Sequence, residues 1–458
     1  MARTILFQKL KRIFYKAYCQ NIQSAGVSKA SKYKRRRLLK LGILAGGSTV
    51  ATTTFPWLKT AWSKYQPNIA IIGGGLAGLN AAYQLKKVGL IATVYEAKSR
   101  VGGRVHSVTG VAEKDLVSDL GGLFINSGHE DILALVEEFN LSLFNRIAHG
   151  EKSPFPLEAY FFNNKLYSEA EVAEKLRPIA QQIALDADLL DRDFERYAPI
   201  LDRLSVAEYL DKHGDKITEP FIRVLLENTI RTEYGVEPEL SSALQLIYNL
   251  ATVEDDRVTV LGGSDEAYVV RGGSGKIIDS LEAAIPQQIQ TNKRLIQIQA
   301  YGDGYRLIFR DRSVVDADYV IIAIPFSVLR NVTLKVELEP KFRKFIREVD
   351  LGKNEKVFAG FENRVWLQEE GFTENAWCDL GFSQVWVGTQ RQPEQENSAL
   401  TFFLGGKQVT SIESKSLSSL HQTFLERFQQ IIPQAKSSAT EKSFHTNWHS
   451  DPLNCIFS

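Results

Sequence analysis

Apolar and polar residues follow two different periods along this chain, and the alternation between them predicts an α/β architecture. Residues 69–72 (IAII) form a short uninterrupted apolar run, which is typical of a strand buried in a parallel sheet. Residues 76–88 follow with the apolar spacing of a helix, and residues 91–95 form a second apolar run. We therefore predict a strand–helix–strand unit at the start of the folded chain.

The same patterns predict the later elements. Residues 130–139 (EDILALVEEF) have the spacing of an amphipathic helix, and residues 167–250 are largely helical in pattern. Residues 294–310 alternate apolar and polar positions through a Gly-Asp-Gly turn, which predicts a hairpin. Residues 318–325 (DYVIIAIP) predict a buried strand that ends at a proline.

Composition places the chain among ordinary globular proteins. Its 458 residues, 44% apolar and 24% charged, can fill two or three domain-sized cores. The three cysteines, Cys19, Cys378 and Cys455, lie far apart, and the seven histidines show no metal-ligand spacing. We therefore predict neither a disulfide framework nor a metal site.

The net charge of +1 conceals an asymmetry between the tail and the body. Residues 1–65 hold 14 of the 55 Lys and Arg and no Asp or Glu, which leaves 41 basic against 54 acidic residues, a net charge of −13, in the remainder. An acidic body argues against nucleic-acid binding by the folded part.

The basic tail has the layout of an export signal. Residues 34–40 (KRRRLLK) resemble the twin-arginine motif R-R-x-F-L-K, and residues 41–55 form an apolar segment that is too short for a stable membrane span. We expect export by the twin-arginine route, to a periplasm or thylakoid lumen. An organelle transit peptide or a basic arm on a cytoplasmic protein are alternatives. The weak cleavage site at residues 49–51 also leaves an uncleaved membrane anchor open.

Three glycines between the first strand and its helix form a G-x-G-x-x-G motif. Gly73 permits the tight turn, Gly75 lets the backbone approach a pyrophosphate, and Gly78 lets the helix pack close to the strand. The N-terminus of the helix would present N–H groups to the phosphates, and Glu96, after the second strand, would accept hydrogen bonds from ribose hydroxyls. These elements in this order predict a dinucleotide site.

A second glycine turn follows directly. Residues 100–104 (RVGGR) form R-x-G-G-R, in which two guanidinium groups flank a turn and suit a diphosphate. An ordinary solvated loop is the alternative interpretation. The residues that we expect at the cofactor here are Arg100, Gly102, Gly103 and Arg104.

The pair of motifs resembles FAD-binding flavoproteins, and specifically the flavin-containing amine oxidase family, which includes monoamine, polyamine and L-amino acid oxidases. The resemblance implies FAD as cofactor and a Rossmann-like FAD-binding domain with an inserted α+β substrate-binding domain. Residues 119–125 (DLGGLFI) match a family segment that passes close to the flavin, so the resemblance places Gly121 and Gly122 there. On spacing alone, a glycine bulge in a strand fits equally well. Residues 317–325 match the family's returning strand, A-D-x-V-I-x-A-x-P.

Lys356 is the candidate catalytic residue that the resemblance implies. Trp366 follows it by ten positions, as in the family's K-(x)9-W segment, where the lysine is a water-bridged partner of flavin N5 and helps the reduced flavin react with oxygen. On the residues alone, an exposed surface lysine is the commoner case. Residues 231–235 (RTEYG) resemble a segment near the substrate chamber, where Glu233 either attracts a substrate ammonium or lies on a helix face.

Residues 446–452 (TNWHSDP) resemble the W-x-x-D-P start of the family's closing segment. In relatives that segment runs on through a Gly and a Tyr to an F-A-G-E motif and a helix against the flavin; here Ile456 and Ser458 occupy the Gly and Tyr positions. We therefore expect a chain that is truncated at its C-terminus and that leaves apolar sheet surface uncovered.

The predicted organisation and function follow from these matches. The resemblance implies oxidative deamination of a primary amine or L-amino acid by oxygen, giving an imine or carbonyl product, ammonia and hydrogen peroxide. The alternatives are a catalytically inactive truncated flavoprotein remnant, or a related flavin desaturase or porphyrinogen oxidase. The predicted parts are the basic tail with its signal (1–65), the FAD-binding domain (66–150 and 263–330), the substrate domain (151–262, helical, and 331–445), and the truncated start of the closing FAD-binding segment (446–458).

Overall fold

The computed structural model describes residues 66–453 apart from residue 263, residues 389–391, residue 393 and residues 395–396. The predicted export signal and the last five residues of the predicted closing segment lie outside the described residues. Within the described part of the chain, no helix combines the length and the apolar character needed to cross a membrane.

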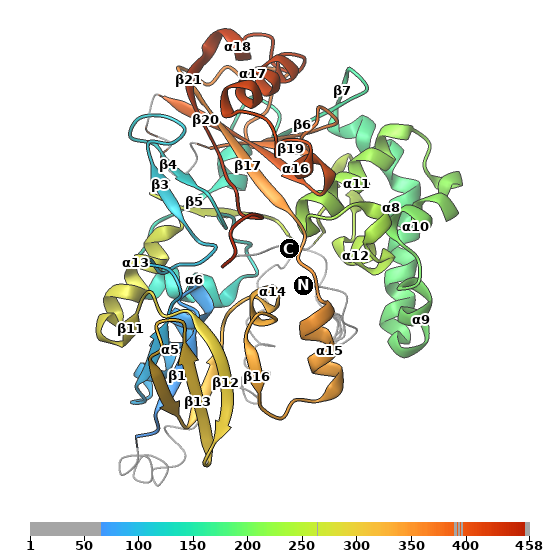
Figure 1. Ribbon diagram of the computed structural model, residues 1–458. Helices are drawn as coiled ribbons and strands as arrows, with labels where there is room; N and C mark the ends of the chain where they lie inside the picture. Colours follow the sequence, from blue (N-terminus) through green and yellow to red (C-terminus); the bar gives the residue numbers. More distant parts are fainter. Residues whose placement is uncertain (1–65, 263, 389–391, 393, 395–396, 454–458) are drawn as a thin grey trace.

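A four-stranded parallel sheet forms the lower part of the molecule in Figure 1. All four residues of its strand β1 (Ile69–Ile72) are buried, as the uninterrupted apolar run at these positions predicts. Helices α5 (Leu76–Lys87) and α13 (Gly275–Ala284) share one apolar core with this sheet, so the predicted strand–helix–strand unit is confirmed. The strands, in spatial order, are β11 (Ile289–Gln290), β2 (Ala92–Tyr95), β1 (Ile69–Ile72) and β15 (Tyr319–Ile322).

Strand β15 lies at the edge of this sheet, where among the described strands it pairs only with β1. The prediction of a buried strand here is wrong, because Tyr319 is 57% exposed and Ile322 is 42% exposed. A run of four apolar residues does not show whether a strand lies inside a sheet or at its edge. That position depends on which other strands pair with it, and the local sequence does not contain this information.

A second sheet packs on the opposite face of the parallel sheet, where Ile72 and Tyr95 share a core with Phe309. The predicted hairpin is confirmed as an antiparallel pair that turns at residues 302–304. The predicted boundary at residue 330 is early, because the short strand that follows it joins this sheet. In spatial order the strands are β14 (Val314–Ala317), β13 (Gly304–Phe309), β12 (Leu295–Tyr301) and β16 (Thr333–Lys335).

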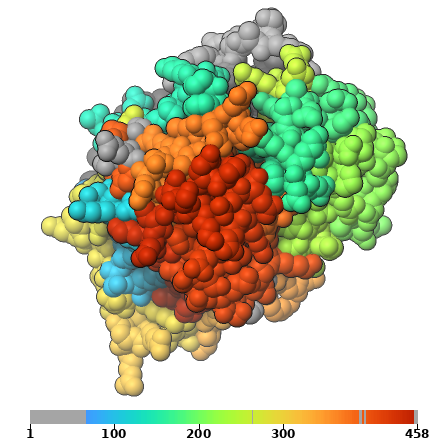
Figure 2. All heavy atoms as spheres, turned by 90° about the horizontal axis from the view of Figure 1, so that it is seen from above, coloured from blue at the N-terminus to red at the C-terminus, as the bar shows by residue number. Residues whose placement is uncertain are grey.

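A seven-stranded sheet forms the upper part of the molecule. Its first two strands in the sequence come from the block predicted to be helical (151–262). That block is helical only between residues 169 and 249, and two short paired strands follow its last helix. Helix α17 (Leu417–Phe428) covers one face through aromatic contacts, such as Phe402 with Phe428 at 5.7 Å; Figure 2 shows this cover as the red atoms seen from above. The strands, in order, are β21 (Ala439–His445), β17 (Asn354–Phe361), β20 (Ser398–Gly405), β19 (Gln384–Val387), β18 (Asn375–Cys378), β6 (Glu158–Phe162) and β7 (Lys165–Tyr167).

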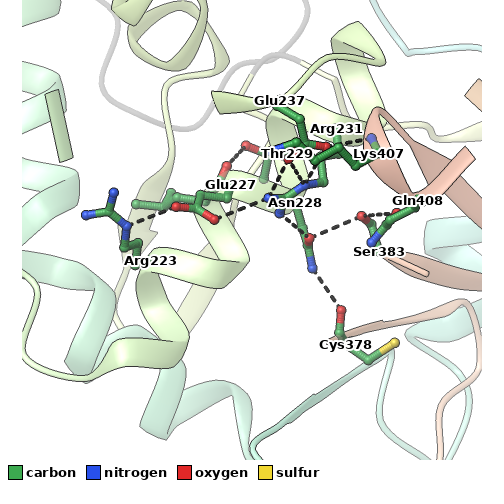
Figure 3. A network of polar contacts seen from close by, with 11 residues as sticks. Arg223, Glu227, Asn228, Thr229, Arg231, Glu237, Cys378, Ser383, Lys407 and Gln408 are labelled. Carbon is green, nitrogen blue, oxygen red and sulfur yellow. Dashed lines mark hydrogen bonds and ion pairs between the residues drawn. The ribbon is translucent and has the colours of Figure 1, made fainter. Parts of the chain in front are cut away.

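The helical block packs against this sheet on the right of Figure 1. Helix α8 begins with a capping box: the Ser168 hydroxyl accepts from the Glu171 N–H, and the Glu171 carboxylate accepts from the Ser168 N–H. A polar network, shown in Figure 3, joins the block to the sheet: the Asn228 amide donates to the Cys378 carbonyl at 2.8 Å. The helices are α8 (Glu169–Arg192), α9 (Phe194–Leu201), α10 (Val206–Lys212), α11 (Pro220–Tyr234) and α12 (Ala243–Asn249).

Shorter elements connect these layers. Two of them, α6 (Glu130–Glu138) and α14 (Phe326–Leu329), line the cavity described below. The others include β3 (Ser107–Thr109), β4 (Val117–Asp119), β5 (Leu143–Asn145), α7 (Arg146–Gly150), β10 (Tyr268–Val270), α15 (Pro340–Glu348) and α16 (Lys407–Thr410). Helix α6 begins at the predicted residue and ends within one residue of its predicted end.

Candidate active site

A cavity of about 1360 Å³ runs from the carboxyl ends of β1 and β2 toward the seven-stranded sheet. Its wall combines the glycine turn after β1, the turn after β2, the segment after β4, and residues from α6, β12 and α14. Ligands of open α/β sheets bind at this end of the strands. Seven of the predicted cofactor residues line the cavity: Gly73, Gly75, Glu96, Gly102, Gly103, Arg104 and Gly122.

Gly78 does not line the cavity but holds α5 against β1. A Cβ at position 78 would lie 1.9 Å from the carbonyl oxygen of Gly73, so only glycine permits this approach. At Gly75, by contrast, the nearest atom to an added Cβ is 4.0 Å away. The backbone at position 75 is therefore open to a ligand.

The N-terminus of α5 faces the cavity. Gly75 is its N-cap and contributes no side-chain cap, and Leu76, Ala77 and Asn80 of the first turns line the cavity. The first N–H groups of a helix are donors with a positive dipole end, which suits a phosphate.

Glu96 is placed by the end of β2, and its side chain is almost fully buried at the cavity wall. One carboxylate oxygen accepts a hydrogen bond from the Gly74 N–H at 2.7 Å, and the other accepts one from the Lys98 N–H at 2.8 Å. A carboxylate oxygen has more than one acceptor site, so each oxygen can also accept from a ribose hydroxyl.

The two arginines of R-x-G-G-R have different positions. Arg104 lines the cavity, as predicted. Arg100 lines a separate polar hollow instead, and its guanidinium donates to the carbonyls of Val101 and Gly103 at 3.0 Å each. The prediction of Arg100 as a direct cofactor contact is therefore not met, because the turn itself uses its donors. Gly102 has φ of +98°, a backbone conformation that the turn requires and that favours glycine.

Lys356 lies on β17 and does not itself line the cavity, but its ammonium contacts the segment after β4 next to Gly122, which does line it. Lys356 is 6% exposed, so the surface-lysine interpretation is wrong. Its ammonium donates to the carbonyl of Asp119 at 3.0 Å and to that of Gly121, and it lies 5.6 Å from the centre of the Trp386 ring. Gly121 does not line the cavity, because its Cα packs on the carbonyl of Arg104.

Trp366 lies away from this wall. It is fully buried in the core under α17, where its ring packs edge-on against Phe361 at 5.3 Å. The K-(x)9-W spacing therefore joins one residue beside the cavity to one residue of the core.

An aromatic group that the sequence did not reveal borders Lys356. Phe124 lines the cavity and meets Trp386 edge-on at 5.4 Å, and Trp386 contacts Phe403 at 4.8 Å. Phe124 directly follows D-L-G-G-L and could have been found there. Trp386 and Phe403 lie on separate strands, and nothing local to either position indicates that they meet.

A buried charged cluster lies behind Phe124. The Arg146 guanidinium stacks on the Phe124 ring at 4.1 Å and pairs with Glu374 at 3.0 Å and Glu266 at 3.5 Å. Burial raises the pKa of Glu266 to about 7, although Arg146 opposes the shift. Burial also raises the pKa of Glu158. Arg146, Glu266 and Glu374 come from three separate parts of the chain, so no local pattern in the sequence indicates that they meet.

Glu233 lies on an exposed part of α11, as the helix-face interpretation predicts. The RTEYG segment does not interrupt the helix, since α11 continues to Tyr234 and ends at Gly235 in the left-handed conformation. Arg231 of this segment pairs with Glu237 at 3.0 Å within the network of Figure 3.

The segment after β21 closes the site on its far side. The Trp448 indole N–H donates to the carbonyl of Leu120 at 2.9 Å, Asp451 pairs with Lys98, and Leu453 lines the cavity. It therefore contacts both the Lys356 side of the cavity and the Glu96 side.

The residues present fit FAD. An open backbone at Gly75, a helix N-terminus, a carboxylate with spare acceptor sites and an arginine line one cavity. A lysine with an aromatic neighbour lies behind the wall of this cavity, in contact with the residue before Gly122. Within the described residues, no group of His, Cys, Asp and Glu has the arrangement of a metal site.

Comparisons with known proteins agree with this architecture. Residues 76–454 match the family model described as flavin containing amine oxidoreductase. A Dictyostelium discoideum protein, "Probable flavin-containing monoamine oxidase A", is 24% identical over 69% of this chain and 69% of its own length. L-amino-acid oxidase of Crotalus adamanteus is 25% identical over 65% of this chain, which thus spans 58% of that protein.

Solved structures show the same fold. A putrescine oxidase bound to putrescine superposes with a TM-score of 0.70 at 19% identity, covering 86% of this chain and 87% of that one. Cyclohexylamine oxidase from Brevibacterium oxydans gives 0.67 at 19% identity, covering 85% and 86%. The family match covers most of the chain, and FAD is the cofactor that this family implies. The chain therefore belongs to the family of flavin-containing amine oxidoreductases.

Proposed function

We propose that this chain catalyses FAD-dependent oxidative deamination of a primary amine or an L-amino acid. The amine loses two electrons to become an imine, water hydrolyses the imine to a carbonyl compound and ammonia, and oxygen takes up the two electrons and two protons to give hydrogen peroxide. The observation that carries the proposal is Lys356, a buried ammonium held on the carbonyls of Asp119 and Gly121 beside the cavity. A buried charge is costly unless hydrogen bonds compensate it, and these two carbonyls do so for Lys356.

FAD supplies the electron acceptor of this reaction when it is bound. The residues of this chain that would hold it are the backbone at Gly75 and the first turn of α5 for the diphosphate, and Glu96 for the ribose. Arg104 would add positive charge at the phosphates. Gly122 would let the backbone pass close to the ring system.

On the substrate side, Phe124 lines the cavity and would contact the carbon chain of the amine, while Trp386 and Phe403 pack behind it and support its ring. The Nζ atom of Lys356 would hold a water molecule beside the flavin, where it assists the transfer of protons to oxygen. The named relatives include oxidases of monoamines, L-amino acids, putrescine and cyclohexylamine, which supports testing these four kinds of substrate.

The test is hydrogen peroxide release from the FAD-loaded protein with a panel of those substrates. Lys356→Met is expected to lower the rate at least tenfold for any amine that is oxidised, since general acid–base assistance contributes on the order of 10²–10⁴-fold. Lys344→Met is the matched control, because Lys344 is 65% exposed on α15. Bound flavin that no amine reduces would overturn the proposal and favour an inactive remnant; reduction by a porphyrinogen or another non-amine donor alone would favour the desaturase or porphyrinogen oxidase alternative.

We also propose export by a twin-arginine route, to a periplasm or thylakoid lumen. The support is the sequence KRRRLLK at residues 34–40 and the apolar segment after it. Replacing Arg35, Arg36 and Arg37 by lysine is expected to retain the protein in the cytoplasm, as fractionation would measure. Unchanged export would contradict the route.

A further inference from the structure

We propose that Thr446 and Glu355 position Lys356, so that the oxygen reaction of the enzyme depends on a hydrogen-bonded unit outside the cavity. This rests on the proposed function, which places Lys356 beside the flavin. Neither residue lines the cavity, and each acts through contacts with β17 and with the segment that follows β21.

Thr446 joins that segment to Lys356 by two hydrogen bonds and to Glu355 by a third. Its N–H donates to the Lys356 carbonyl at 2.9 Å, and its hydroxyl oxygen accepts from the Lys356 N–H at 2.8 Å. The hydroxyl hydrogen is directed to the Glu355 carboxylate. A hydroxyl has one hydrogen, so donation to Glu355 turns its lone pairs toward the Lys356 N–H.

Glu355 is 1% exposed, and a buried carboxylate requires donors. Besides the Thr446 hydroxyl, it receives the His449 N–H at 3.0 Å and the His449 ring nitrogen Nδ1 at 2.8 Å. The other ring nitrogen of His449 lies 3.3 Å from Glu413 at the surface. Glu355 thus fixes both Thr446 and His449 on the same side of β17.

Trp448 extends the unit to the cavity wall. Its indole donates to the Leu120 carbonyl at 2.9 Å, which lies between the two carbonyls that accept from the Lys356 ammonium. One short segment, residues 446–449, therefore holds the side of the Lys356 backbone that β20 does not pair with, and also the Leu120 carbonyl between the two residues that bind the lysine side chain. If the segment shifts, the lysine loses its position even though its charge remains.

Thr446→Val and Thr446→Ser test this relation. Valine keeps the shape and removes the hydroxyl, and serine keeps the hydroxyl. The holoenzyme is reduced with dithionite, mixed with oxygen, and followed by the return of flavin absorbance, so no amine is needed. A displacement of about 1 Å can cost on the order of 100-fold in rate. We expect Thr446→Val to slow reoxidation by tenfold to a hundredfold, and Thr446→Ser to remain within about threefold of the wild type.

Further measurements separate positioning from folding. Flavin content, the FAD dissociation constant and the visible spectrum are recorded for each variant, and Glu355→Gln is included because it retains the shape but removes one acceptor. We expect a shifted flavin spectrum and slow reoxidation at nearly normal FAD affinity. Equal reoxidation rates in wild type, Thr446→Val and Glu355→Gln would overturn the proposal, as would slow reoxidation explained fully by lost FAD. A protein that reoxidises normally but accepts no amine would contradict the proposed function and leave this relation intact.

Discussion

The carbonyl oxygen of Gly73 lies 1.9 Å from the point where a Cβ at position 78 would stand. Helix α5 thus approaches β1 at a distance that only glycine permits at position 78. We expect Gly78→Ala to lower the free energy of unfolding by about 1–3 kcal/mol, because the backbone must shift to admit the methyl group. FAD affinity should fall with it, since the same shift moves the N-terminus of α5. Thermal unfolding with and without FAD measures both effects.

Gly214→Ala is the matched control for this variant. Nothing lies within 4 Å of a Cβ at position 214, so stability should change by less than about 0.5 kcal/mol. Equal losses in the two variants would mean that the contact of Gly78 with Gly73 has no special role.

Arg100→Leu and Arg104→Leu should separate the stability of the turn from cofactor binding. Arg100 holds the carbonyls of Val101 and Gly103, so its loss should reduce the stability of the apoprotein by about 1–2 kcal/mol. Arg104 lines the cavity, so its loss should weaken FAD binding about tenfold, or about 1.4 kcal/mol, with little change in the apoprotein. Fluorescence titration with FAD and melting of the apoprotein distinguish the two. The reverse pattern would contradict the assignment.

Glu266 should make stability depend on pH. Burial raises its pKa to about 7, whereas an unfolded glutamate titrates near 4.3, so the folded state binds this proton more tightly. Stability therefore falls as pH rises through the window from about 4.5 to about 7, by at most about 4 kcal/mol from this group. Glu266→Gln should remove most of that fall. Melting temperatures of both proteins from pH 5 to pH 8 test this; parallel curves would contradict it, and Glu239→Gln, at an exposed position, is the control.

Cys378 should resist thiol reagents in the native protein. Its side chain is buried, and burial raises the pKa of the thiol, so the reactive thiolate is disfavoured. Mass spectrometry after treatment with iodoacetamide should find Cys378 unmodified before unfolding and modified afterwards. Rapid native alkylation of this cysteine would show that the core under α17 opens readily.

The sequence predicted the parts of the fold that are set by local pattern. The strand at residues 69–72, the glycine turn and helix after it, and the carboxylate after β2 follow one another in the sequence. One local requirement, close approach to a phosphate, determines these residues, so the pattern can be recognised from the sequence alone. Lys356 was found through its spacing to Trp366, yet only Lys356 lies beside the cavity.

What the sequence could not predict depends on contacts between distant segments. The edge position of β15, the entry of β6 into the seven-stranded sheet and the meeting of Arg146 with Glu266 and Glu374 all arise from tertiary packing. The prediction that Arg100 contacts the cofactor was not met for a local reason. A guanidinium can donate to the carbonyls of its own turn as well as to a phosphate, and the motif R-x-G-G-R is the same in both cases.

The proposed function requires that FAD occupies the cavity and is reduced there by an amine. The decisive measurement is the visible spectrum of the protein after incubation with FAD and removal of the excess, followed by anaerobic addition of the substrate panel. We predict the two visible bands of a bound oxidised flavin, their loss with at least one amine or L-amino acid, and their return on admission of air. A folded protein that remains colourless would contradict the assignment of the cavity to FAD. A bound flavin that no substrate reduces would contradict the proposed oxidation of an amine.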